Sequence, residues 1–283
     1  MSPTNSEALV SPQWLAAHLE DPQVRVIDIA GLGQDEMEAY RTGHIPGAVC
    51  WKWKDMLWDE RARDFPAPAE FARRLGAAGI GRDTRVVFYG APMQFGVYAW
   101  WTFRYCGHKN VALLDGGRKR WRAEGRPLVT DEPAEHAAVA YAPAARDESM
   151  RILRDEVLQA VRRGGSVILD GRSPEEYSGK RVGGPGGPDV GAVRAGRIPG
   201  ARHLHYAELL DADERFKSRD ELRALFQAHG AAPDAEIITY CRMSHRATVL
   251  HFALTQLLGH GKVKVYDGSW TEWGNLVGVP VER

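Results

Sequence analysis

The chain has 283 residues, and its 37 Lys and Arg side chains balance its 37 Asp and Glu side chains. A formal charge of zero provides no overall field to attract nucleic acid or an anionic membrane, so any electrostatic selectivity must be local. A hydrophobic content of 44% and a charged content of 26% are ordinary for globular proteins and argue against disorder. The length allows one large domain or two of common size.

Three further features favour a cytoplasmic protein. No run of about 18 apolar residues predicts a membrane span. The first ten residues lack the basic start and apolar core of a secretory signal. The cysteine count of three argues against a disulfide framework and for a reducing compartment. We therefore expect a soluble cytoplasmic protein, most simply a monomer, without nucleic-acid or membrane partners.

The first half of the chain carries a series of short elements. An apolar strand ending in aspartate is expected at residues 24–28, followed by the turn sequence Gly-His-Ile-Pro-Gly-Ala at 43–48. A β-branched strand is expected at 86–89, and Leu-Leu-Asp-Gly-Gly at 113–117 precedes Trp121. The next segment, 127–150, is rich in Ala, Pro and acidic residues without periodicity, which indicates a surface linker.

The same elements return in the second half at nearly constant spacing. A strand ending in aspartate is expected at 166–170, and the turn returns as Gly-Arg-Ile-Pro-Gly-Ala at 196–201, an offset of 153. The strand at 237–240 and the segment Val-Tyr-Asp-Gly-Ser at 265–269, before Trp273, have offsets of 151 and 152. Ordered matches of this kind predict two copies of one domain.

The repeat divides the chain into a first domain at residues 8–126, a linker at 127–150 and a second domain at 151–283. In each copy, short β-branched runs alternate with amphipathic helical stretches. This alternation predicts an α/β fold in which a parallel sheet is covered by helices on both faces.

Cys241 directly follows the strand at 237–240 and opens the loop Cys-Arg-Met-Ser-His-Arg before an amphipathic helix expected at 246–258. Open α/β folds place their sites at this carboxyl edge of the sheet. A loop that enters a helix N-terminus directs backbone N–H groups at one point, and Arg242 and Arg246 add positive charge. All three effects favour the thiolate, the nucleophilic form of cysteine. The alternative interpretation is an inert buried cysteine.

The first copy is an internal control for this interpretation. It has Gly90 at the position of Cys241, in a loop that carries neither thiol nor cation. A structural cysteine would give no reason for the two loops to differ so completely in charge. Cys106 is interpreted as a small core residue, and Cys50 has no cationic neighbours in sequence beyond Lys52 and Lys54.

At these residues the chain resembles the rhodanese family, specifically the tandem-domain sulfurtransferases. The resemblance rests on Tyr-Arg-Thr-Gly-His-Ile-Pro-Gly-Ala at 40–48, on Val-Lys-Val-Tyr-Asp-Gly-Ser-Trp-Thr-Glu-Trp at 263–273 and on the Cys241 loop, and it covers about residues 10–283. It implies an inactive first domain and an active second one with the site between them, and no cofactor. It also implies that the cysteine takes the outer sulfur of a small-molecule donor such as thiosulfate, becomes a persulfide, and passes that sulfur to cyanide or a thiol.

The resemblance also implies roles for several neighbours of the cysteine. Family members hold the donor with an arginine shortly after the Asp-ending strand, the position of Arg172. Arg242 matches the basic residue that follows the cysteine in thiosulfate enzymes, whereas mercaptopyruvate enzymes have small neutral residues there. Thiosulfate is therefore the expected donor, with 3-mercaptopyruvate as the alternative. Ser244, His245 and Arg246 are further candidate substrate contacts, although Arg246 alternatively caps a neighbouring element and His245 is alternatively an exposed loop residue.

A Gly/Pro-rich insertion at 183–187 precedes the second turn and is expected to form a flexible loop. Arg181 or Arg194, which flank it, alternatively reach the donor.

Three rival functions fit the sequence less well than sulfur transfer does. A phosphatase with this kind of loop needs five residues between cysteine and arginine, whereas four separate Cys241 from Arg246. A non-catalytic binding module fits the first copy but not Cys241 together with Arg172 and Arg242. No cysteine has a second Cys or His at a metal-ligand spacing, so no metal is expected.

Overall fold

The computed structural model describes residues 8–31, 37–132, 135–184 and 186–283; Pro185 of the predicted insertion lies outside these ranges. The chain forms two compact units, residues 1–147 with 212–215, and residues 148–211 with 216–283. Among the described residues, no helix is long and apolar enough to cross a membrane.

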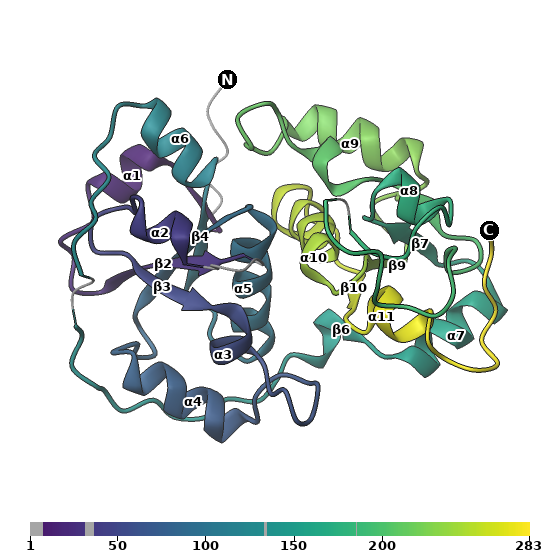
Figure 1. Cartoon of the computed structure of the whole chain (residues 1–283), viewed down its shortest axis with the longest axis horizontal. Helices are drawn as coiled ribbons and strands as arrows, with labels where there is room; N and C mark the ends of the chain where they lie inside the picture. Colours follow the sequence, from purple (N-terminus) through teal and green to yellow (C-terminus); the bar gives the residue numbers. More distant parts are fainter. Residues whose placement is uncertain (1–7, 32–36, 133–134, 185) are drawn as a thin grey trace. The chain divides into compact units, whose positions relative to one another are not determined.

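The first unit is built on a five-stranded parallel sheet in the order β1-β5-β4-β2-β3. Its strands are β1 (Leu9–Val10), β2 (Val24–Ala30), β3 (Val49–Lys52), β4 (Arg85–Ala91) and β5 (Val111–Leu114). Its helices are α1 (Pro12–Ala16), α2 (Glu38–Arg41), α3 (Trp53–Leu57), α4 (Pro68–Ala77), α5 (Gln94–Tyr105) and α6 (Gly117–Ala123). Figure 1 shows α1, α2 and α6 on one side of the sheet and α3, α4 and α5 on the other.

The second unit repeats this topology, with the order β6-β10-β9-β7-β8. Its strands are β6 (Arg151–Ile152), β7 (Val167–Asp170), β8 (Arg202–His203), β9 (Ile237–Tyr240) and β10 (Val263–Tyr266). Its helices are α7 (Arg154–Arg163), α8 (Pro174–Tyr177), α9 (Arg219–Ala228), α10 (His245–Phe252) and α11 (Ser269–Trp273), with short 3₁₀ turns η1 (Glu148–Met150) and η2 (Tyr206–Leu209). The prediction of two parallel α/β copies is confirmed.

The central strands of the second unit are buried along their whole length, as expected when helices cover both faces of a parallel sheet. β7 and β9 are hydrogen-bonded neighbours, and their register places Asp170 opposite Tyr240, directly before Cys241. The helix after this point begins at His245. It continues through a π-helical turn, η3 (Ala253–Leu257), to Gly259.

The segment predicted as a linker packs along the first unit. Val129 exchanges two main-chain hydrogen bonds with His44, and the Asp147 N–H donates to the Tyr105 carbonyl at 2.7 Å. These contacts explain why residues up to 147 group with the first unit.

Candidate functional site

Cys241 lies between β9 and α10 and is 1% exposed. Its N–H donates to the Ser269 hydroxyl at 3.1 Å, and its carbonyl accepts from the Trp270 N–H at 3.0 Å. Both partners belong to α11, which follows β10. Because β9 and β10 are adjacent parallel strands, their carboxyl ends bring these two segments together.

Ser269 holds the Cys241 loop from outside it. Its Oγ accepts from the N–H groups of Cys241 and Ser244, at 3.1 and 3.3 Å, and donates to the Tyr266 carbonyl at 2.9 Å. The φ angle of Ser269 is +52°, and Gly117, its counterpart in the first unit, has +51°. A side chain is strained in this left-handed region and glycine is not. Sequence reasoning missed Ser269, although the Gly-to-Ser difference between the copies was a visible signal.

Ser244 and His245 are both buried in the structure. The Ser244 hydroxyl lies 2.8 Å from the Asp267 carbonyl oxygen and 2.6 Å from its carboxylate, so this side chain anchors the loop to the end of β10. His245 is 6% exposed, and burial lowers its pKa to about 3. The ring is therefore neutral at pH 7. The alternative interpretation of His245 as an exposed loop residue is wrong, because α10 begins at this residue and packs it inside the unit.

Arg246 is held by a bidentate ion pair with Glu176 of α8. Its Nη1 and Nη2 atoms lie 2.6 and 2.8 Å from the two Glu176 oxygens. Glu176 is fully buried and also accepts from the Ser173 N–H in the capping box of α8. Burial alone lowers the pKa of Arg246, but the Glu176 hydrogen bonds and the nearby Cys241 raise it further than burial lowers it. Arg246 thus joins a neighbouring element and also supplies a fixed positive charge near Cys241.

Arg172 is fully buried beside Asp170, at the end of β7. Its Nε lies 3.0 Å from both carboxylate oxygens, and its Nη2 lies 2.6 Å from one of them and 2.8 Å from the Gly196 carbonyl. The guanidinium also stacks over the Trp270 ring, 4.5 Å from its centroid. Among the described residues, only the Nη1 atom of this group lacks a hydrogen-bond partner. If Arg172 contacts the sulfur donor directly, the contact is therefore limited to its buried Nη1 atom.

In the first unit, the positive charge near the buried aspartate comes from a different element than Arg172 does in the second. Asp28 is the counterpart of Asp170, but Ala30 stands where Arg172 would be. Arg118, from α6, instead provides the nearby positive charge and donates to the Gly43 carbonyl at 2.8 Å. Burial nevertheless raises the pKa of Asp28 to about 6. The two copies therefore share a buried aspartate but neutralise it to different extents.

Arg242 is positioned by the segment that follows the Gly/Pro-rich insertion. Its Nη2 donates to the Val190 carbonyl at 2.9 Å, and a Cβ at Gly191 would lie only 2.9 Å from the same atom. The lack of a side chain at Gly191 thus allows this close approach. Arg194 is committed elsewhere, because its guanidinium donates to four main-chain carbonyls at and after the end of α11. Arg181 bonds within the insertion itself.

The other two cysteines have different surroundings. Burial raises the pKa of the Cys50 thiol to about 12, and Cys106 is buried at the end of α5. The position of Cys241 in the first unit has no room for a side chain, because a Cβ on Gly90 would lie 2.9 Å from the Gly96 nitrogen. Within the described ranges, no three His, Cys, Asp or Glu side chains cluster as metal ligands would.

The model of the rhodanese-like domain matches residues 11–124 and 153–276. The chain belongs to the rhodanese-like family. Each matched stretch covers four of the five strands of one sheet, and the two matches confirm the tandem rhodanese architecture expected from the motifs at 40–48 and 263–273.

Relatives of similar length carry names that refer to sulfur. The "Sulfur carrier protein TtuD" of Thermus thermophilus is 45% identical, over 100% of this chain and 99% of its own. A "Putative thiosulfate sulfurtransferase" of Saccharopolyspora erythraea is 41% identical, over 99% and 98%. A crystal structure of an anaerobic ergothioneine biosynthesis enzyme from Chlorobium limicola shares the fold, with a TM-score of 0.85 at 24% identity, covering 100% of this chain and 72% of that one.

Proposed function

We propose that this rhodanese-family protein is a sulfurtransferase that moves a sulfane sulfur from thiosulfate, through a Cys241 persulfide, to cyanide or a thiol. The observation that carries the proposal is the surroundings of Cys241: a buried sulfur at the end of β9, with the Arg246 guanidinium fixed nearby by Glu176 and Arg242 as the next residue. The names of the relatives support the same chemistry.

The reaction consists of two displacements at sulfur. The Cys241 thiolate attacks the outer sulfur of thiosulfate, the S–S bond of the donor breaks, and sulfite leaves with the bonding electron pair. The enzyme then carries one additional sulfur as a persulfide anion. Cyanide or a thiolate attacks this terminal sulfur, and the Cys241 thiolate is regenerated as the leaving group.

The reacting sulfur atoms carry negative charge in both steps of this reaction, and the Cys241 loop offers several groups to stabilise that charge. Among the described residues, the N–H groups of Arg242 and Met243 have no hydrogen-bond partner, so they are available to an anion at the loop. Arg242 is proposed to bind the sulfonate of the donor, with Nη1 of Arg172 as a second contact. His245 is neutral and is proposed to contact the substrate without contributing charge. Ser244 contributes by fixing the loop through Asp267.

The identity of the sulfur acceptor separates two candidate functions: an enzyme passes the sulfur to a small molecule, whereas a sulfur carrier passes it to a protein. A relative named as a sulfur carrier at 45% identity favours a second candidate function, in which the persulfide is delivered to a protein thiol. Both candidates share the first half-reaction with thiosulfate, so that step tests them together.

We expect Arg242→Gln to lower kcat/KM for thiosulfate about ten- to a hundredfold in a steady-state assay with cyanide. A charge-assisted contact to the sulfonate accounts for about 1.5–3 kcal/mol, and 1.4 kcal/mol corresponds to one decade. The effect with 3-mercaptopyruvate should be smaller, because its carboxylate carries one charge. Arg162→Gln removes the same charge from the exposed face of α7 and serves as the control. If wild-type protein prefers 3-mercaptopyruvate, or Arg242→Gln spares thiosulfate, the assignment of the donor is wrong.

We expect Ser269→Gly to lower kcat/KM about tenfold with little change in thermal stability. The substitution removes the hydroxyl that accepts from Cys241 and Ser244, each contact contributing about 1 kcal/mol, while it relieves the strained φ of +52°. Steady-state kinetics and calorimetric Tm measure the two effects. The matched control is Gly117→Ser, which places the same strain in the first unit and should leave turnover unchanged. Equal turnover in Ser269→Gly and wild type would show that the loop does not depend on this hydroxyl.

A further inference from the structure

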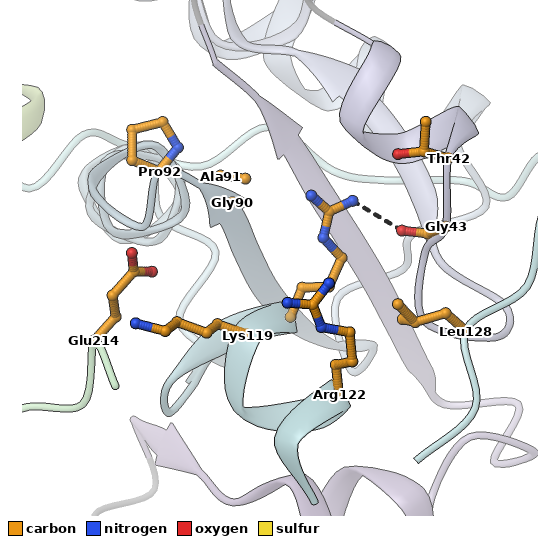
Figure 2. Close-up of a pocket in the computed structure, with 10 residues that line it drawn as sticks. Thr42, Gly43, Gly90, Ala91, Pro92, Lys119, Arg122, Leu128 and Glu214 are labelled. Carbon is orange, nitrogen blue, oxygen red and sulfur yellow. Dashed lines mark hydrogen bonds between the residues drawn. The ribbon is translucent and has the colours of Figure 1, made fainter. Parts of the chain in front are cut away.

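The first unit contains a basic pocket of about 280 Å³ at the carboxyl end of β4. Its basic side chains, Arg118, Lys119 and Arg122, come from α6. Gly90–Pro92 line it from the end of the strand, and Figure 2 shows them together with Lys119 and Arg122. Since Gly90 is the counterpart of Cys241, the pocket lies where the second unit has its cysteine loop.

The positive charge of this pocket is not balanced by its lining. Arg120, on the same helix but outside the pocket, is paired with Asp115 at 2.5 Å. In contrast, the three basic side chains of the pocket form no ion pair with any residue that the structure describes. The acidic lining residue is Glu214, from the segment 212–215 that groups with the first unit. Glu214 and the buried Asp28 near Arg118 provide two negative charges against three positive ones, so the pocket keeps an excess of positive charge.

These cations are not part of the repeated scaffold. At the offset of 152 that aligns Trp121 with Trp273, the second unit has Trp270, Thr271 and Gly274 at the corresponding positions. Arg118 has a structural contact, because it donates to the Gly43 carbonyl. The Arg122 side chain is exposed and makes no hydrogen bond or ion pair in the described part of the chain. A contact that stabilises the fold therefore does not account for an arginine at this position.

We propose that this pocket binds a small, doubly charged oxyanion of the class that includes sulfate, sulfite and thiosulfate. The excess of positive charge favours an anion, and three basic side chains with guanidinium and ammonium donors suit the several oxygen atoms of such a group. The volume accommodates such an anion together with several waters, each of which occupies about 30 Å³. The proposal does not depend on the chemistry at Cys241.

Isothermal titration calorimetry tests the proposal: the full chain is titrated with sodium sulfate at constant ionic strength, and the heat of binding is measured. We expect the double variant Lys119→Gln/Arg122→Gln to weaken sulfate binding at this pocket at least about tenfold, which corresponds to the loss of about 1.4 kcal/mol. The matched control Lys109→Gln/Arg162→Gln removes two exposed charges elsewhere and should bind sulfate as the wild type does. Equal weakening in both variants, or in neither, overturns the proposal.

A second measurement locates the anion. Crystals of the full chain soaked in selenate should give an anomalous selenium peak beside Lys119 and Arg122, and the double variant should not. A wild-type crystal that shows selenate only beside Arg242, at saturating concentration, also overturns the proposal.

Discussion

Cys241→Ser is expected to abolish sulfur transfer, lowering turnover at least about a thousandfold, as loss of a nucleophile does in other covalent enzymes. Serine fits the buried position after β9 and retains the backbone contacts to Ser269 and Trp270. Its hydroxyl is much less acidic than a thiol and cannot hold a sulfane sulfur. The calorimetric Tm should therefore stay close to that of the wild type.

Intact-mass measurement separates this prediction from a general loss of structure. After incubation with thiosulfate, the wild type and the control Cys50→Ser should each gain one sulfur atom, and Cys241→Ser should gain none. Cys50 is a suitable control because burial holds its thiol pKa near 12, which keeps it protonated at neutral pH. Added sulfur on Cys241→Ser, or retained turnover, would falsify the assignment of the nucleophile.

The repeat made most of the fold predictable. The strands around 24–28, 86–89, 166–170 and 237–240 all appear, because each is a short β-branched run whose boundary is marked in the sequence. The two copies also differ at Cys241, whose counterpart is Gly90, and this difference marks the nucleophile in the sequence. In these strands the local sequence pattern agrees with the position in the fold, so a single sequence was sufficient to predict them.

The partners of the site's side chains were less predictable, because they depend on contacts between distant segments. Ser269 lies 28 positions after Cys241 in the chain and touches it only through the adjacency of β9 and β10. The partner of Arg246, Glu176, is 70 positions away on α8. Spacing along a loop can indicate which residue types are present, but it does not reveal which acid a buried arginine will pair with.

Asp170→Asn should strongly destabilise the second unit, by about 3–5 kcal/mol. Asparagine keeps the shape of the side chain but removes the charge that neutralises Arg172, which is fully buried and has its Nε and Nη2 directed at this carboxylate. The remaining contacts of the guanidinium, to the Gly196 carbonyl and the Trp270 ring, do not supply a negative charge. Calorimetry at pH 8 should show a Tm lower by about 10 °C. A change of less than about 2 °C would show that this pair is not needed for folding.

The matching substitution in the first unit, Asp28→Asn, should have the opposite effect. Burial raises the pKa of Asp28 to about 6 from 3.8, so the folded state binds its proton more tightly than the unfolded chain does. The stability associated with this proton is present below about pH 4 and is lost as the pH rises through 6. At pH 8 the charged carboxylate therefore costs up to about 3 kcal/mol, which Asparagine avoids. We expect the variant to have the higher Tm at pH 8 and the same Tm as the wild type at pH 4. If Asp28→Asn is less stable than wild type at pH 8, then Arg118 neutralises Asp28 as fully as Arg172 neutralises Asp170, and the two copies do not differ in this respect.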